Sequence, residues 1–346
     1  MPIKVRPADL QRDRSLLTDL LSRFLNPDAG GRRFGWLYEE NPDGPAQAWI
    51  AVEEGTGKAV GAAAAFPRRF RVGKSVRRGY VLGDFCIDAH HRSLGLALQL
   101  QRACLKHIEA TSGTLGYDFP SERMMAVYHR MQIAPSCRMV RWAKPLRADR
   151  KIARFVKSPA FARILAAPVN KLLQWRDAAA SAPQNAWTIA KHEGDCGEEF
   201  AQLAETVGAT YGTCIARSPE YLNWRYGRHP LQHHEMLTVR RNDRLEGYIV
   251  FSHADADASI VDFFGIHETQ LWSALLARAL ELLRGRRIET VSVSFEEIHA
   301  CTGLLKKFGF HPRESCPVVV YDPEKIVTFG EEKPSSWFIM DGDRDS

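Results

Sequence analysis

The sequence lacks several features that would mark a membrane, secreted or zinc protein. No apolar run approaches the length of a membrane-spanning helix, and the opening MPIKVRPADLQRDRS is charged and carries no signal-peptide core. The seven cysteines are scattered, odd in number and include no Cys-x-x-Cys pair. They predict neither a disulfide framework nor a zinc site, and we expect reduced thiols in a cytoplasmic protein without a metal.

The chain also lacks a general excess of one charge. Its 346 residues are 45% hydrophobic and 25% charged, which is typical of a globular protein of two domains. The net charge of +6 is local, because eight Lys or Arg and a single acid, Asp149, lie between Arg147 and Arg176. The rest of the chain is close to neutral, so nucleic acid is not the expected partner.

The most informative stretch is Tyr80–Ala97, YVLGDFCIDAHHRSLGLA. An apolar strand runs into the turn Arg92–Ala97, and a helix with apolar periodicity follows at once. Such a turn leaves backbone N–H groups pointing one way at a helix N-terminus, where the helix dipole favours an anion. Gly95 lets the backbone approach a bulky anion because it has no Cβ. The stretch therefore predicts a cradle for a phosphate or pyrophosphate; the alternative is an ordinary strand–turn–helix with a chance glycine.

The amino-acid sequence of this cradle resembles the coenzyme A loop of the GNAT acyltransferase superfamily. In that loop the pattern Arg/Gln-x-x-Gly-x-Gly/Ala follows the fourth strand, and here it runs from Arg92 to Ala97. The resemblance implies that acetyl-CoA or another acyl-CoA is the co-substrate. The residues it implies for binding are Phe85, Cys86, Ile87, Arg92, Ser93, Leu94, Gly95, Leu96 and Ala97.

The order of predicted elements extends the resemblance over the whole chain. The first part predicts β-α-β-β-β-α-β-α, the GNAT order, with its first helix capped by Asp9. A similar order returns from Trp187 and ends at Lys307–Phe310, which resembles the close of the last GNAT helix. The chain thus resembles bacterial tandem-GNAT proteins. We expect an α/β fold of two GNAT-like domains, each a mixed, partly antiparallel sheet flanked by helices.

The two halves are predicted to be unequal. The expected divisions are a GNAT acyl-CoA-binding domain at residues 1–146, a basic helical linker at 147–185 and a degenerate GNAT-like domain at 186–346. After its fourth strand the second half reads Asp262–Gln270, with no Arg-x-x-Gly-x-Gly and with Glu268 where a pyrophosphate would lie. We expect this half to be structural or to shape a groove for the acceptor. Arg225, Arg228 and His229 could line such a groove for an anionic acceptor, or form a solvated basic face.

Direct attack of an amine on a thioester needs an oxyanion donor and a proton for the departing thiolate. By family resemblance the donor is a main-chain N–H near Cys86 and Ile87. The sequence Arg130–Ile133 aligns with the Gly-Phe close of the family's last helix, which puts Tyr128 on the family's Tyr position. Tyr128 is therefore the candidate catalytic acid, with a core-flanking aromatic as the alternative.

The base is Asp84 in our expectation, with Asp118 and His90 as the other options. For Asp84 and Asp118 the alternative is a strand-end hydrogen-bond acceptor, and a relayed water can replace a single base. Cys86 has no partner pattern for a nucleophile and is interpreted as a small buried thiol.

The basic segment has three interpretations. Pro159, Pro168 and Pro183 are expected to cut it into short amphipathic helices. These helices could form a linker packed on both domains, rest on an anionic membrane surface, or contact nucleic acid. We favour them in that order.

Together these features predict an acyl-CoA-dependent N-acyltransferase, in the first instance an N-acetyltransferase. Its acceptor would be a primary amine on a small molecule, an amino sugar or a peptide. The alternatives are an acyl or aminoacyl transferase for envelope or polysaccharide assembly and a non-catalytic acyl-CoA-binding or scaffold protein. Fold alone does not name the substrate.

Overall fold

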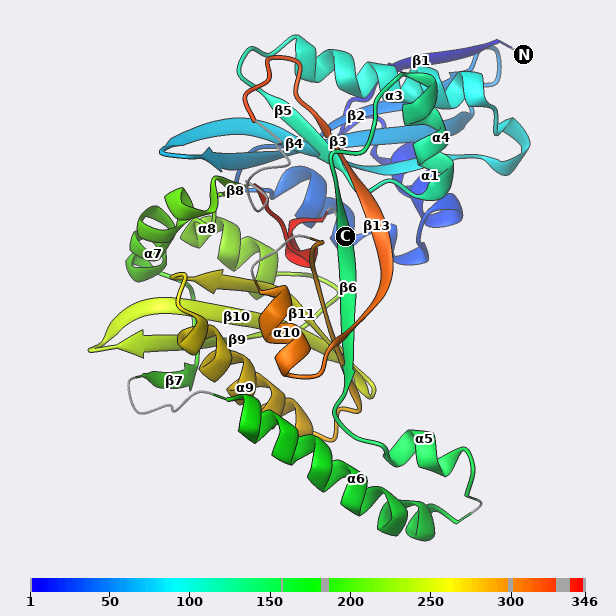
Figure 1. The fold of residues 1–346 in the computed structure, drawn as a ribbon. Coiled ribbons are helices and arrows are strands. Elements are labelled where there is room, and N and C mark those ends of the chain that lie inside the picture. Colours follow the sequence, from blue (N-terminus) through cyan, green and yellow to red (C-terminus); the bar gives the residue numbers. More distant parts are fainter. Residues whose placement is uncertain (1, 157, 182–186, 298–300, 328–336, 345–346) are drawn as a thin grey trace.

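The computed structural model describes residues 2–156, 158–181, 187–297, 301–327 and 337–344. Their strands join into one sheet of 14 strands that carries helices on both faces (Figure 1). The expected mixed, partly antiparallel α/β architecture is therefore confirmed.

The first half builds its sheet around an alanine-rich strand. Its elements are β1 (Ile3–Pro7), α1 (Arg14–Phe24), α2 (Arg32–Phe34), β2 (Gln47–Glu53), β3 (Ala59–Val72), β4 (Ser75–Ile87), α3 (Leu94–Glu109), β5 (Leu115–Asp118), α4 (Glu122–Arg130) and β6 (Cys137–Pro145). In β3, Ala62 and Ala64 join the core that includes α1, whereas Ala63 and Ala65 join the core on α3. Side chains alternate along a strand, so these small residues let helices approach both faces.

The second half repeats the order with its own elements. They are β7 (Thr188–Lys191), α7 (Glu198–Gly208), β8 (Thr213–Ile215), α8 (Pro219–Leu222), β9 (His234–Arg241), β10 (Arg244–Ala254), β11 (Asp257–Gly265), α9 (Thr269–Gly285), β12 (Thr290–Glu296), α10 (Thr302–Lys307), β13 (His311–Tyr321) and β14 (Trp337–Phe338). The segment between the halves forms α5 (Asp149–Ala153) and α6 (Pro159–Ala180).

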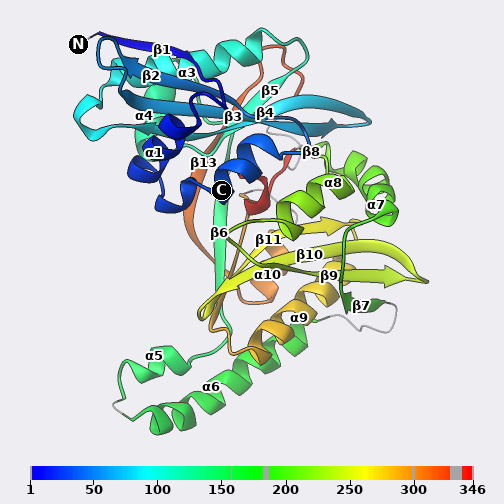
Figure 2. The same cartoon turned by 180° about the vertical axis from the view of Figure 1, so that it is seen from behind.

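The halves exchange their last strands. The sheet order is β1-β2-β3-β4-β5-β13-β6-β12-β11-β10-β9-β7, with β8 on β3 and β14 on β8. Strand β13 of the second half pairs with β5 of the first, and β6 of the first half pairs with β12 of the second. These two long strands run together between the two parts in Figures 1 and 2. The three-part division of the chain remains a prediction, but the shared strands tie its halves together.

Two tryptophans mark the contact between the halves. The Trp36 indole N–H donates to the Trp224 carbonyl, and the Trp224 indole N–H donates to the Trp36 carbonyl, each at 2.9 Å. Their rings stack with centroids 4.5 Å apart. No local pattern predicts this reciprocal pair, although both tryptophans lie two residues before a tyrosine, Tyr38 or Tyr226.

Several helix predictions were wrong. Asp9 does not cap α1: its carboxylate accepts from the N–H groups of Gln11 and Arg12, one turn before the helix begins. Pro168 does not end a helix, because it lies inside α6, which is 22 residues long. The predicted helix from Glu297 begins later, at Thr302, and residues 298–300 lie outside the described residues. Pro183 is likewise outside them.

The predicted strands of one hairpin were too short, and two strands in the middle of the sheet were not predicted. The β3–β4 hairpin is longer than expected and turns at Gly73, which has φ +56°. Strands β6 and β13 were missed. In β13 the two prolines Pro312 and Pro317 oppose a strand assignment by composition. The fourth strand of the second half, predicted at Ser259–Gly265, is β11 (Asp257–Gly265), and Asp262 lies within it.

Candidate functional site

The site begins where two parallel strands part. Strands β4 and β5 pair only over Gly79–Val81 and Leu115–Tyr117. Beyond that point a cavity of about 560 Å³ opens between them. Its wall combines α1, β3, β4, α3 and α4, and includes Leu82, Gly83, Asp84, Phe85, Cys86, Ile87, Arg92, Ser93, Leu94, Ala97, Gln101, Asp118, Met124 and Val127.

The N-terminus of α3 lies at the mouth of this cavity. Ser93 is its N-cap, and the Ser93 hydroxyl accepts from the Leu96 N–H at 3.3 Å. The N–H groups of Leu94 and Gly95 have no acceptor among the described residues, as expected for a first helical turn. A Cβ built on Gly95 would meet nothing within 4 Å, and Arg92–Gly95 are exposed. The predicted cradle is thus open and has the donors that an anion needs.

A β-bulge aims one backbone donor at the opening. Ala62 pairs with Cys86 and Ala64 with Gly83, so β4 holds one extra residue, and Asp84 there has φ +46°. The Asp88 N–H donates to Val60 across the same antiparallel pair. Because hydrogen-bonded pairs alternate, the Cys86 N–H belongs to the β3 ladder and the Ile87 N–H points away from it. Of these two backbone donors, the Ile87 N–H is the one turned away from the β3 ladder.

Asp84 is held in a buried ion pair. Its carboxylate accepts two 2.9 Å hydrogen bonds from the Arg33 guanidinium and one of 2.8 Å from the Tyr38 hydroxyl. Burial, followed by the Asp84 charge, raises the pKa of Tyr38 well above its ordinary value, so it remains a neutral donor. Both carboxylate oxygens are engaged, which suits Asp84 to fixing the bulge.

Tyr128 lies behind the wall of the cavity. Its hydroxyl donates to Asp118 at 2.7 Å and accepts from the Gln101 amide at 2.8 Å, and both of these partners line the cavity. Burial, then the charge of Asp118, raises the pKa of Tyr128 well above its usual value. Tyr128 is thus a neutral phenol that positions Asp118.

The backbone supports the alignment that singled out Tyr128. Gln132 has φ +61°, the left-handed conformation, and the corresponding Gly309 has φ +82°. The Ile133 N–H donates to the Tyr128 carbonyl, and the Phe310 N–H donates to the Leu305 carbonyl. The two helices therefore end in the same way, with Tyr128 in one half and Leu305 in the other.

The structure gives Cys86 the environment of a buried thiol. All seven cysteines are unpaired. Cys86 is buried, and burial followed by the Asp84 charge raises its pKa to about 12. The thiol is therefore protonated at neutral pH, in agreement with its interpretation as a small buried side chain.

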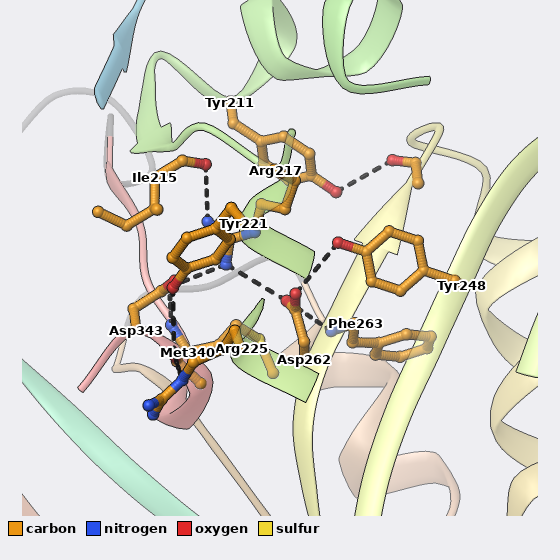
Figure 3. Close-up of polar contacts among 12 residues, drawn as sticks. Tyr211, Ile215, Arg217, Tyr221, Arg225, Tyr248, Asp262, Phe263, Met340 and Asp343 are labelled. Atoms are coloured by element: carbon orange, nitrogen blue, oxygen red, sulfur yellow. Dashed lines mark hydrogen bonds and ion pairs between the residues drawn. The ribbon is translucent and has the colours of Figure 1, made fainter. Parts of the chain in front are cut away.

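The second half has an Asp-Phe pair on its own bulged strand but surrounds it with protein (Figure 3). Asp262 accepts from Arg217 at 3.3 Å and from Tyr248 at 3.1 Å. Arg217 also donates to Asp343 at 2.8 Å and to the Ile215 carbonyl. Burial opposes the charge of Arg217, but the two carboxylates outweigh it and raise its pKa well above its ordinary value.

The segment around Asp343 occupies the place of the first half's cavity. Pairing of β11 with β12 ends at Ile260 and Val293. Just beyond, the Ser294 hydroxyl donates to Asp341, and Gly342 lies against the Val261 carbonyl. At the start of α9, Glu268 makes no side-chain cap and instead accepts from Arg241 at 2.7 Å. Both features leave an anion little access to the N-terminus of α9.

A further cavity of about 450 Å³ lies beside the tryptophan pair. Arg225, His229 and His234 line it, whereas Arg228 does not. His229 contacts the Trp36 ring, and burial followed by the Arg225 charge lowers its pKa to about 3. His229 is therefore neutral near pH 7, and the wall combines neutral imidazoles with the guanidinium groups of three arginines and the carboxylates of Glu314 and Asp341.

Sequence reasoning missed Arg33, Tyr38 and Gln101. Arg33 lies 51 residues before Asp84, in a segment with no motif, so no local pattern signals the pair. Gln101 had a weak signal, since it lies on α3 within two turns of the cradle. Gly95 and Leu96 were predicted to bind and belong to the cradle, but neither side chain lines the cavity wall. No described group of His, Cys, Asp and Glu has the arrangement of a metal site.

Comparison with solved structures identifies the fold. A probable N-acyltransferase from Enterococcus faecalis superposes with a TM-score of 0.67 at 12% identity, covering 92% of this chain and 72% of that one. A GCN5-related N-acetyltransferase from Anabaena variabilis gives 0.66 at 15% identity, with coverage of 92% and 72%. Saccharomyces cerevisiae N-myristoyltransferase, solved with myristoyl-CoA, gives 0.59 at 12% identity and 93% and 79% coverage.

No protein-family model matches the chain, and no curated protein matches its sequence. The structural similarities nevertheless establish that the chain has the fold of the GCN5-related N-acetyltransferases, as the cradle resemblance implied. Identities of this size show the fold alone, so activity rests on the site.

Proposed function

We propose that the protein is an acyl-CoA-dependent N-acyltransferase whose donor site is the first-half cavity, with acetyl-CoA as the first donor to test. The observation that carries the proposal is the open cavity between β4 and β5 with the uncovered N-terminus of α3 at its mouth. The thioester supplies an activated acyl group. Arg92 and the N–H groups of Leu94 and Gly95 hold the pyrophosphate, and the Ile87 N–H binds the oxyanion.

The proton transfers fall to residues at the end of β5. Asp118 lines the cavity and is positioned by Tyr128, so it is the better base for the attacking amine, directly or through a water, and the proton that it accepts then passes to the departing thiolate. Asp84 keeps the bulge and its Ile87 donor in place through Arg33. Tyr128 and Asp84 therefore act through other groups in this proposal, and both remain to be tested.

The two halves form a tandem arrangement in this proposal. The second half shapes the acceptor groove, because its cavity of about 450 Å³ is also lined by Met139 and Arg141 of β6 and by His229, whose ring contacts Trp36 of the first half. Arg225 and the neutral His229 and His234 suit an amine acceptor that also carries an anionic group. A cytoplasmic location follows from the reduced thiols of the sequence interpretation.

One observation favours a second candidate, an acyl-CoA-binding protein without turnover. Of the two residues most expected to be catalytic, Asp84 is held by the buried Arg33, and Tyr128 is itself buried and bonded to Gln101 and Asp118. A protein that only binds acyl-CoA would keep the cradle and need no titrating group at the cavity.

The test is thermal melting with acetyl-CoA and with a long-chain acyl-CoA. At about 100 times its Kd a ligand adds about 2.7 kcal/mol to the native state, which raises Tm by a few degrees. The Arg92→Glu/Gly95→Glu variant should lose this shift. The Gln99→Glu/Arg102→Glu variant changes the same charges on an exposed part of α3 outside the cavity wall and should keep it.

Turnover with amine acceptors separates the two candidates. Asp118→Asn should retain the melting shift and lower kcat/KM by about 100-fold or more if Asp118 is the base. A wild type that binds acyl-CoA but acylates no amine in a broad acceptor screen would favour the binding protein. A wild type that no acyl-CoA stabilises would remove the basis of both candidates.

A further inference from the structure

Helix α6 leaves a broad apolar face in water. With α5 it projects from the body as an arm, and the C-terminal part of α6 runs beside α9 (Figures 1 and 2). Large apolar side chains recur along α6 at spacings of three or four and so share one helix face. They are Phe161 (55% exposed), Ile164 (66%), Leu165 (43%), Val169 (40%), Leu172 (62%) and Trp175 (68%).

This face is not the one that attaches the arm. Asp177 is buried and pairs with Lys144 and, at 2.5 Å, with Arg284. Asn170 bridges to α5 by donating to Asp149 and accepting from the Ala148 N–H, both at 2.8 Å. These residues lie on the side of α6 opposite the apolar face, so a rigid anchor presents that face outward.

The unpaired charges of the arm have one sign. Lys151, Arg154 and Lys171 are exposed and have no ion-pair partner among the described residues. The acidic residues of the arm do not offset these cations, because Asp149 pairs with Arg147 and Asp177 is buried. Phe155, at the turn between α5 and α6, is 89% exposed.

We propose that this arm docks on an anionic lipid bilayer, with the α6 face in the interface and the Lys and Arg side chains among the headgroups. Exposed Leu, Ile, Phe and Trp flanked by cations is the composition of an interfacial helix. A second copy of the chain fits less well, since two arms of equal positive charge would repel one another. None of the described helices combines the length and apolar composition that would let it cross a bilayer. The proposal is independent of the acyltransferase assignment.

The test is flotation with vesicles of phosphatidylcholine alone and of phosphatidylcholine mixed with phosphatidylglycerol. Wild type should float only with the anionic vesicles, and less at high salt. Leu172→Glu should lower the partition coefficient at least tenfold, whereas Val76→Glu, an equally exposed apolar site on the β3–β4 hairpin, should leave it unchanged. Neutralising Lys151 or Lys171 to Gln should cost about fivefold each without altering the apolar face.

Two results would overturn the proposal. The first is a wild-type protein that floats with neither kind of vesicle, or that floats equally with both. The second is a concentration-dependent dimer in sedimentation that Leu172→Glu dissociates, which would assign the face to a second copy. Thermal melting of Leu172→Glu should match that of wild type. If Leu172→Glu unfolds instead, the two Lys→Gln variants test the docking, and unchanged flotation of both would then contradict it.

Discussion

The two halves place an Asp-Phe pair on the same kind of bulged strand and use it differently. Asp84 pairs with Arg33 at the wall of an open cavity, whereas Asp262 pairs with Arg217 in a region filled by protein. What fills it is the segment from Met340 to Asp343, which lies across β11 and β12 beyond the end of their pairing. A shared architecture therefore yields a candidate binding site only where no later segment of the chain occupies the gap between the strands.

The largest expected difference is in the unfolding free energy lost when Arg217 or Arg33 is replaced. Arg217→Leu leaves Asp262 and Asp343 buried without their cation and should cost about 3–5 kcal/mol of unfolding free energy. Arg33→Leu should cost about 1–3 kcal/mol, because water in the neighbouring cavity can solvate Asp84. Urea unfolding measures both.

Equal losses for the two variants would mean that the first-half pair is as dehydrated as the second. That result would weaken the view of the first half as the open one.

The two halves can also be compared through the pH dependence of their stability. Each has a carboxyl group at the end of a strand, Asp118 in β5 and Glu296 in β12. Asp118 borders the cavity, but Glu296 is buried, and burial raises its pKa to about 7. The native state therefore holds this proton more tightly than the unfolded chain, and stability falls as the pH rises from about 4.5 through 7. Glu296→Gln cannot ionise and should be more stable than wild type by about 2 kcal/mol at pH 8, with little difference at pH 4.

The matched change Asp118→Asn should show no such gain at pH 8. Unfolding of both variants at several pH values is the measurement, and a pH-independent effect of Glu296→Gln would contradict the assignment.

The smallest expected difference in unfolding free energy is between variants at the N-termini of α3 and α9. Ser93→Ala removes the α3 cap and should cost about 1 kcal/mol. Glu268→Ala removes only a half-exposed ion pair with Arg241 at the start of α9 and should cost at most about 0.5 kcal/mol. Denaturant midpoints of the two variants, compared without ligand, give the order, and a larger loss for Glu268→Ala would reverse our description of the two helix starts.

The sequence by itself determined what depends on neighbours along the chain. The cradle from Arg92 to Ala97 could be predicted because a strand, a tight turn and a capped helix are consecutive. The equivalence of Tyr128 and Leu305 could be predicted because each lies at a fixed distance from a helix end. The sequence also indicated the cationic character of the arm, since the charges there are contiguous.

Tertiary structure decided what depends on residues far apart. Arg33 meets Asp84 across 51 residues of the first half, and Trp36 exchanges hydrogen bonds with Trp224 where the two halves touch. The same long-range packing decides which half stays open, because the segment that fills the second half comes from the far end of the fold. It also decides which face of α6 stays in water, because Asp177 and Asn170 attach the opposite face to the rest of the protein.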